Sequence, residues 1–227
     1  MYKNKYSKKD FHGKNIIMPD NNDIGCFGVD SYDIIGQAGD GKGSDGAIVG
    51  YTKFNMTEAP DSSFFLIYKE RPKKRDDFFD DVIMACMFFG FYALIESNKS
   101  RLLEYMYDKG LTGFALRRNK KWKDLTKAEQ TWGGIPSSTN VIQDQTSLIQ
   151  DYISDFVGIN LENDCKVYHK ELIQEWIDLK PNKRKEFDLG VASGMAIMGA
   201  RYKDKRRYSD SEDNRKTNGL SFSSFGA

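Results

Sequence analysis

The sequence predicts an α/β fold built on a mixed sheet of five strands with helices on its faces. Apolar stretches at residues 24–30, 47–54 and 63–68 are joined by loops and predict an antiparallel meander. From Asp76 onward, the apolar residues follow the i, i+3, i+4 spacing of a helix. Helical and extended segments then alternate as far as residue 117, which is typical of parallel βαβ units.

The first helix is expected over residues 76–90, because its apolar residues share one face and its N-terminal end is acidic, where the helix dipole favours negative charge. A fourth strand follows at 91–96. A short helix at 101–109 is closed by Gly110, a residue common just after a helix end. Residues 113–117 are the fifth predicted strand.

Beyond residue 122, apolar residues predict helices near 145–157 and 169–178, the second of them ended by Pro181. The last helix is expected to begin at Asp188. One of its faces carries small or flexible residues that let it pack close to the sheet: Ala192, Met195, Ala196 and Gly199. The predicted order is therefore β-β-β-α-β-α-β-α, with extra helices before the last.

The composition is that of one globular domain with polar ends. The chain has 227 residues, of which 39% are hydrophobic and 30% charged. We expect an irregular leader at 1–22, one domain at 23–202 and a disordered tail at 203–227, which is rich in polar residues. The chain has no apolar run long enough to span a membrane and no signal peptide at its polar start. Its three scattered cysteines indicate a reducing cytoplasm and fit neither a zinc nor a disulfide pattern.

Three acidic residues stand where predicted elements end or begin. Asp30 ends the first apolar strand, Glu96 ends the fourth strand, and Asp188 opens the last helix. Such positions converge when strands are neighbours and a helix faces them, and carboxylate oxygens suit hard cations such as Mg²⁺ or Mn²⁺. The pattern predicts a two-metal site for phosphodiester hydrolysis. The structural alternatives are a strand-end turn at Asp30 or Glu96 and a helix cap at Asp188.

The glycine-rich connection at 31–46 offers further candidates. Asp45 is a candidate ligand of the second metal, although a turn-forming role is the common one for such an aspartate, and a role for Asp33 is left open. Residues 36–43 nearly match a P-loop, but Gly43 stands in the Ser/Thr position and an extended segment follows, which argues against nucleotide binding there. A phosphate-backbone contact through Lys42 is the alternative that we prefer.

Basic residues form blocks in a chain whose net charge is only +1. Residues 117–123 and 201–207 each carry five positive charges, and such blocks either follow a phosphate backbone or form ordinary solvated surface. Trp122 is either a base-stacking residue or a partly buried anchor. The candidate DNA contacts are Lys42, Arg117, Arg118, Lys121 and Lys123.

The order of elements and the placement of the acids resemble the ribonuclease H-like fold. Within it, the chain is most similar to the nuclease domain of the large terminase subunit of tailed phages. The segments that carry this resemblance are Phe27-Gly-Val-Asp30, Ser44–Val49, Ala93–Asn98, Gly134–Thr139, Tyr168–Leu172 and Phe187–Ala192, within roughly residues 23–202. The last motif departs from many relatives, which carry two adjacent acids where Phe187 here separates Glu186 from Asp188.

The resemblance implies that Asp30, Glu96 and Asp188 bind two Mg²⁺ or Mn²⁺ ions and cut double-stranded viral DNA with little sequence preference. It also implies a packaging ATPase domain upstream, joined through residues 1–22, and a portal and a small terminase subunit as partners. We expect a protein of the host-cell cytoplasm that is a monomer in isolation and has no membrane partner. The alternatives are another ribonuclease H-like nuclease, such as a junction resolvase, and a non-catalytic module that docks on a portal or capsid protein.

Overall fold

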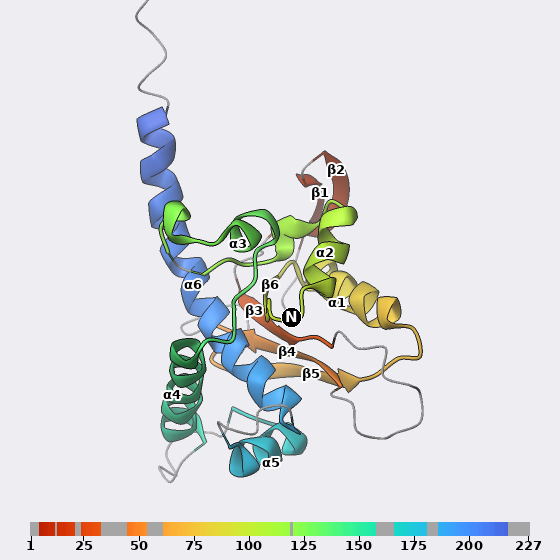
Figure 1. The fold of residues 1–227 in the computed structure, drawn as a ribbon, viewed down its shortest axis with the longest axis vertical. Coiled ribbons are helices and arrows are strands. Elements are labelled where there is room, and N and C mark those ends of the chain that lie inside the picture. The colour runs from red at the N-terminus through yellow and green to blue at the C-terminus, as the bar shows by residue number, and fades with distance from the viewer. Residues whose placement is uncertain are drawn as a thin grey trace, which may run out of the picture.

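A mixed sheet of four strands, in the order β5-β4-β3-β6, forms the centre of the α/β fold (Figure 1). The antiparallel meander expected from the sequence is confirmed in β3 (Gly25–Asp30), β4 (Gly46–Thr52) and β5 (Phe64–Glu70). Strand β6 (Tyr92–Ile95) lies parallel to β3, as predicted for a strand reached through a helical crossover.

The structure is a computed structural model that describes residues 5–11, 13–20, 24–32, 45–53, 61–118, 120–157, 166–180 and 186–217, with the side chains of residues 11 and 203–217 excepted. Asp33, Lys42 and the P-loop-like segment lie outside these residues. Strand β4 follows that segment, in line with the argument against a P-loop.

The two faces of the sheet are covered by different helices. Helices α1 (Arg75–Phe89) and α2 (Arg101–Asp108) lie over one face, and α6 (Asp188–Thr217) crosses the other, beside α4 (Thr139–Phe156) and α5 (Lys170–Asp178) (Figure 1). Because strand side chains alternate between faces, Cys26 packs with the α6 residues, whereas Phe27 and Val29 pack with α1. The even-numbered residues of β3 therefore point toward α6.

Helix α6 approaches β3 more closely than ordinary side chains would permit. A Cβ atom added to Gly28 would lie 1.8 Å from the carbonyl oxygen of Ala192. Ala192, Met195 and Ala196 are all buried in the core between the helix and the sheet. This confirms the prediction that the small-residue face packs close to the sheet, and it fixes the position of the helix start at Asp188.

The predicted fifth strand at 113–117 is wrong in extent. Residues Thr112–Phe114 form a 3-10 turn, and Ala115 makes only an isolated parallel bridge to Ala93. The glycines Gly133 and Gly134, both at φ 83°, turn the chain back toward β6. Ile135 then donates to the carbonyl of Ile95 and accepts from Ser97, so two short segments share an edge that one strand was expected to fill.

The irregular leader expected over residues 1–22 contains a β-hairpin instead. Strands β1 (Tyr6–Phe11) and β2 (Lys14–Pro19) pair antiparallel around a turn with Gly13 at φ 83°. Ile16 and Met18 are buried against α1, while Ile17 between them is exposed. The hairpin was missed because only these two inward-facing apolar residues mark the alternation, among many lysines.

Helix α6 continues to Thr217, into the segment from residue 203 that was expected to be disordered, and the disorder of that tail stays a prediction. The residues after Arg201 are mostly polar, so no helical spacing of apolar residues could be recognised there. They contain no glycine or proline before Gly219 that would end a helix. Within the described residues, none of the helices is long and apolar enough to cross a membrane.

Candidate active site

The register of the sheet brings two charged residues onto the α6 face at one edge. Asp30 is the last residue of β3 and pairs with Ala47 of β4, which in turn pairs with Lys69 of β5. Residues paired in this way point to the same face of the sheet. The small side chain of Ala47 therefore lies between the carboxylate and the ammonium group.

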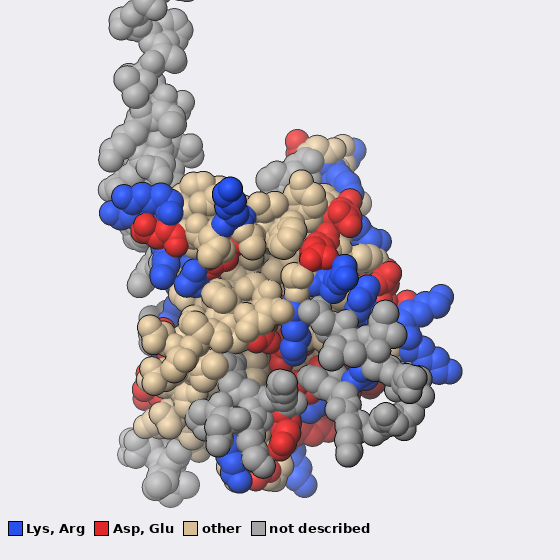
Figure 2. All heavy atoms as spheres, in the orientation of Figure 1, with Lys and Arg blue, Asp and Glu red and all other residues tan. Residues whose placement is uncertain are grey.

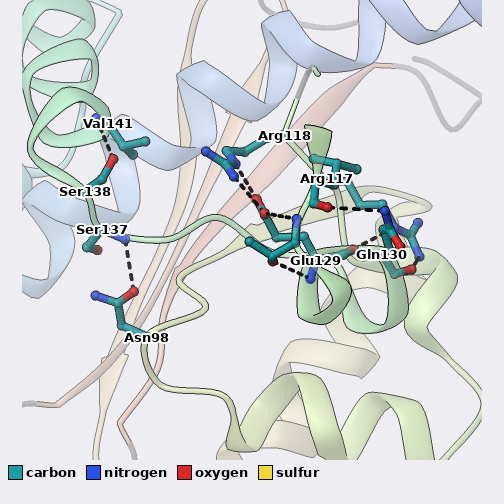
Figure 3. A network of polar contacts seen from close by, with 10 residues as sticks. Asn98, Arg117, Arg118, Glu129, Gln130, Ser137, Ser138 and Val141 are labelled. Atoms are coloured by element: carbon teal, nitrogen blue, oxygen red, sulfur yellow. Dashed lines mark hydrogen bonds and ion pairs between the residues drawn. The ribbon is translucent and has the colours of Figure 1, made fainter. Parts of the chain in front are cut away.

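Glu96 reaches the same edge from the other side of β3. It directly follows β6, and its backbone N–H donates to the carbonyl of Val29, the neighbour of Asp30. Ser137 donates its hydroxyl to the Glu96 carboxylate. The backbone N–H of Ser137 donates to the side chain of Asn98 at 3.2 Å, and this contact fixes the segment that carries the serine (Figure 3).

Asp188 reaches the same edge from α6, of which it is the first residue. Its Oδ2 accepts a hydrogen bond from the backbone N–H of Asp45 at 3.1 Å and lies 3.7 Å from Nζ of Lys69. Lys69 also pairs with Glu175 of α5 at 2.7 Å. Asp45, the predicted further ligand, thus lies beside Asp188. Burial would lower the pKa of Lys69, but Glu175, Asp188 and Asp45 together raise it.

Lys99 is the residue that connects the three predicted carboxylates. Its Nζ lies 2.6 Å from Asp30 Oδ1 and 3.8 Å from Glu96 Oε2. Burial lowers the pKa of this ammonium, and Asp30, Glu96 and Asp188 outweigh burial and raise it. All three carboxylates therefore lie within electrostatic reach of one positive charge.

The carboxyl of Asp30 is the group whose protonation is most altered. It is 3% exposed, and this burial, with a smaller contribution from Glu96, raises its pKa to about 8 against the opposing effect of Lys99. The Lys99 ammonium stays charged because three carboxylates face it, so Asp30 is the group of this pair that titrates, near pH 8.

The donor chemistry of this cluster fits a hard divalent cation, since it consists of carboxylate oxygens with hydroxyl and backbone support. Within the part of the chain that the structure describes, however, no three acidic, histidine or cysteine side chains are grouped as a metal ion would need. Lys99 lies between Asp30 and Glu96, where it supplies the positive charge that the carboxylates require. A bound cation would therefore have to take over contacts that this ammonium now makes.

A basic rim, defined as Arg71, Lys73, Lys74 and Arg75, lies at the same sheet edge and was missed in the sequence. These residues follow β5, whose last residue Glu70 pairs with Gly46, near the Asp30 end of the sheet. Figure 2 shows Lys and Arg side chains gathered on that side of the molecule. Nearby, the buried hydroxyl of Tyr32 has no hydrogen-bond partner among the described residues.

The predicted DNA contacts at 117–123 lie in a different environment. Arg118 forms a two-pronged ion pair with the buried Glu129, and Arg117 donates to the backbone carbonyls of Glu129 and Gln130 (Figure 3). Although burial would raise the pKa of Glu129, hydrogen bonds from Arg118 and Thr126 hold it below its usual value. These two arginines therefore hold helix α3 (Lys127–Trp132) in place, whatever else they contact.

Residues 120–123 of that block are open to solvent. Lys121 and Lys123 are exposed, and Trp122 is 60% exposed, with the Arg117 guanidinium 5.5 Å from its ring centre. The interpretation of Trp122 as a partly buried anchor is therefore wrong. Contacts of Lys121 and Lys123 with DNA stay a prediction.

Sequence reasoning missed Lys99 and Lys69, although both left a signal. Lys99 stands three residues after Glu96, and Lys69 lies in the register row of Asp30 once the meander is drawn. Glu175 gave no signal, because it lies on α5 and is distant in sequence from the other site residues. Ser137 lies in the segment Gly134–Thr139 that carries the family resemblance, but its contact with Glu96 was not predicted.

Together, the fold and the site define an α/β protein with a mixed sheet flanked by helices and a cluster of carboxylates at one sheet edge. No family model matches this chain, and no curated protein or solved structure shows significant similarity to it.

Proposed function

We propose that the chain is a metal-dependent endonuclease domain of the terminase type, with a ribonuclease H-like fold, that hydrolyses double-stranded DNA with little sequence preference. The observation that carries the proposal is the convergence of Asp30, Glu96 and Asp188, from three separate elements, on the single ammonium of Lys99. Such crowding of carboxylates is costly without a compensating cation. It is therefore more typical of a cation-binding site than of a purely structural one.

The fold supports the proposal at the level of topology. The antiparallel meander β3-β4-β5 and the parallel β6 are compatible with the strand order of the ribonuclease H-like fold. Its fifth strand would here be reduced to the short segments at 115–117 and 134–135, which make isolated bridges. Helix α6 lies across the sheet and supplies the last acid at its first residue.

Asp30, Glu96 and Asp188 would hold two Mg²⁺ or Mn²⁺ ions, with Asp45 beside Asp188 as a further candidate ligand. Such ions, when bound, activate water and neutralise charge on the phosphate. The chain itself holds the carboxylates in place. Ser137 fixes the Glu96 carboxylate, and Lys69 with the Asp45 backbone N–H fixes that of Asp188.

Two further features of this sheet edge concern the binding of a cation and of a nucleic acid. The Asp30 carboxyl holds its proton up to about pH 8 and must lose it before its oxygen can bind a cation. The basic rim at 71–75 offers guanidinium and ammonium groups to the phosphates of a strand that enters the site. By the same proposal, a packaging ATPase domain, a portal and a small terminase subunit are the partners.

The test is cleavage of supercoiled plasmid by the purified chain in Mn²⁺. We expect nicked and then linear DNA from the native protein, and a loss of at least a hundredfold in rate from Asp30→Asn or Asp188→Asn. The matched control is Asp151→Asn, which removes an exposed carboxylate from the solvent side of α4 and should leave the rate unchanged.

Two outcomes would contradict the proposal. One is full activity in both site variants while EDTA abolishes cleavage, because the carboxylates would then not bind the cation. The other is the absence of cleavage by a folded native protein together with no binding of Mn²⁺ by calorimetry. A preference for branched over linear duplex, with a dimer in solution, would point instead to a junction resolvase.

A further inference from the structure

A second group of polar side chains lies where the chain passes from β5 into α1, beside the carboxylates. Strands β3 and β5 run in the same direction, because both pair antiparallel with β4. Asp30 at the end of β3 and Glu70 at the end of β5 therefore lie at one edge of the sheet. Tyr32 follows Asp30 by two residues, and the basic rim at 71–75 follows Glu70 directly. Both segments therefore leave the sheet at the same place.

The side chain of Tyr32 is buried, but its hydroxyl group is not satisfied. The residue is 5% exposed, and the phenol oxygen has no hydrogen-bond partner among the described residues. Packing holds the ring in place, since the Phe78 ring lies 5.5 Å from it and the Arg71 guanidinium 5.3 Å from its centre. Buried polar groups nearly always have a partner, and one without a partner costs free energy. The hydroxyl is therefore suited to donate a hydrogen bond to a ligand.

A second unsatisfied donor lies at the first residue of α1. The Nε atom of Arg75 is buried and has no hydrogen-bond partner among the described residues. A terminal nitrogen of the same guanidinium lies 3.6 Å from the Asp76 carboxylate, and the group lies over the Phe79 ring, 5.2 Å from its centre. A guanidinium carries several N–H donors in a fixed plane, so these contacts leave the Nε side for another acceptor.

The N-terminus of α1 adds backbone donors and positive charge. The helix is 15 residues long, and no side chain caps it at Lys74. Backbone N–H groups in the first turn of a helix have no acceptor within that helix, and together with the helix dipole they attract anions. Lys73 and Lys74 are exposed and add ammonium groups beside this turn. An anion here would meet backbone and side-chain donors at once.

The pKa of Tyr32 supports the proximity of these groups. Burial raises this pKa most. The guanidinium groups of Arg71 and Arg75 lower it, whereas the carboxylates of Asp45 and Asp77 raise it. All four side chains therefore lie within electrostatic reach of the phenol.

The acidic side chains near this group oppose the binding of an anion only weakly. Asp76 and Asp77 are exposed, so water and salt screen their charge. Asp45 is the other acid that acts on Tyr32, and under the proposed function it is a candidate metal ligand, whose charge a bound cation would neutralise. The basic rim carries four positive charges against these three acids.

Asp45 also places this group next to the proposed metal site. Its backbone N–H donates to Asp188 at 3.1 Å, and its charge acts on Lys69 as well as on Tyr32. Tyr32 and Asp30 are themselves only two residues apart. A phosphate held by Tyr32 would therefore belong to the nucleotides beside the cleavage position.

We propose that Tyr32, Arg75 and the first turn of α1 bind one phosphodiester group of the DNA, next to the one that is cut. This inference rests on the proposed function and names, within the basic rim, the site that fixes the strand. The Tyr32 hydroxyl and the Arg75 Nε–H donate to the unesterified oxygens of the phosphate, and the Arg71 guanidinium adds attraction beside them. Such contacts hold the sugar–phosphate backbone without reading a base, in agreement with little sequence preference.

The experiment is fluorescence anisotropy of duplex binding by the full chain, in EDTA and at a series of salt concentrations. Tyr32→Phe should weaken binding about tenfold, the value of a hydrogen bond to a charged group. Because this substitution removes no charge, the slope of log K against log[salt] should stay unchanged. Arg75→Gln should weaken binding and also reduce that slope by about 1. The matched control is Tyr107→Phe, which removes an exposed hydroxyl on α2 and should change neither quantity.

Thermal unfolding separates the loss of a donor from the loss of structure. Because the Tyr32 hydroxyl is unsatisfied in the free protein, Tyr32→Phe should melt no lower than the native protein. Inorganic phosphate should raise the melting temperature of the native protein more than that of Tyr32→Phe. A lower melting temperature of Tyr32→Phe would mean that the hydroxyl already has a partner, and it would overturn the proposal.

The duplex titrations can overturn the proposal in two further ways. One is unchanged duplex binding by Tyr32→Phe, even where inorganic phosphate distinguishes the two proteins, because the site would then hold a free anion and no DNA. The other is weaker binding with a smaller salt slope, because the substitution would then have displaced the cations of the rim. EDTA prevents metal-dependent cleavage, so a chain that binds as expected but cuts no DNA in Mn²⁺ would refute the nuclease proposal alone.

Discussion

Replacement of Lys99 by methionine tests the central feature of the site, because methionine keeps the approximate length of the side chain but removes its charge. Above about pH 8, where Asp30 is ionised, the contacts of 2.6 Å to Asp30 and 3.8 Å to Glu96 correspond to attractions of about 6 and about 4 kcal/mol at an effective dielectric constant of about 20. The cost of removing these charges from water offsets much of this attraction. Loss of one partner from such a buried pair costs about 3–5 kcal/mol.

The metal-free Lys99→Met protein should therefore be less stable than the native protein. For a chain of this size, each kcal/mol changes the melting temperature by about 2–4 °C, so we expect a decrease of roughly 6–20 °C. Lys99→Arg, which keeps the charge, should lose much less. Differential scanning calorimetry of EDTA-treated protein above about pH 8, where Asp30 is ionised, measures both values.

The same substitution should have the opposite effect on metal binding. In the native protein, a cation that binds Asp30 must displace a charge-assisted hydrogen bond worth about 1.5–3 kcal/mol. Without the ammonium, this cost disappears, and affinity for Mn²⁺ should increase by about 10- to 100-fold, at about 1.4 kcal/mol for each factor of ten. Because Lys99 also lowers the pKa of Asp30, its loss favours the protonated carboxyl, so the comparison applies where Asp30 is ionised in both proteins. Calorimetric titrations with Mn²⁺ at a series of pH values above about 8 measure it. Affinity in Lys99→Met equal to or below the native value would refute the reasoning that ammonium and metal share these oxygens.

Four further predictions concern other parts of the molecule. Burial raises the pKa of Asp30 from 3.8 to about 8, so between these pH values the metal-free folded protein retains a proton that the unfolded chain has lost. The free energy of unfolding should therefore fall as the pH rises from about 4 to about 8, by up to about 1.4 kcal/mol per pH unit. Asp30→Asn should flatten this slope in denaturant titrations. Arg71→Gln in the basic rim should weaken duplex binding at every sequence and reduce the salt slope by about 1 in fluorescence anisotropy, whereas Lys127→Gln should not. Glu129→Gln leaves its arginine partner without a counter-charge and should destabilise by about 3–5 kcal/mol in urea unfolding. Gly28→Ala forces a methyl group against the α6 backbone and should cost at least about 1–3 kcal/mol by the same measurement.

The parts of the fold that the sequence predicted are those with a strong hydrophobic period. Strands β3 and β4 are buried along their whole length, and the apolar face of α1 continues to Gly90, whose φ of 68° ends the helix. The element ends followed from the same patterns, so Asp30, Glu96 and Asp188 could be placed at one edge before any contact was known. Helix α4 begins at Thr139, ahead of the expected start, because Ser138 caps it and its first turns carry few apolar residues.

The parts that could not be predicted depend on contacts between distant segments. Nothing in residues 133–135 indicates that Ile135 shares the edge of β6 with the segment at 115–117, because this pairing depends on where two glycine turns place the chain. The cation of the site was missed for the same reason. Lys99 looked like an ordinary surface lysine in the sequence, and its position between two carboxylates follows from the turn after Glu96.

Helix α6 explains why the chemistry at Asp188 should be sensitive to packing far from it. The carboxylate of this residue is positioned by the helix axis, and the axis is positioned by the contact of Ala192 and Ala196 with the backbone of Gly28. Cores of this density accommodate an added methyl group by shifting an element rather than by local compression. A displacement of α6 would move Asp188 away from Lys69 and from the Asp45 N–H together. Gly28→Ala should therefore weaken Mn²⁺ binding as well as stability, whereas a core substitution on the α1 face, such as Val82→Ala, should lower stability alone. Equal loss of Mn²⁺ affinity in both variants would mean that the position of the carboxylate does not depend on the close packing of this helix.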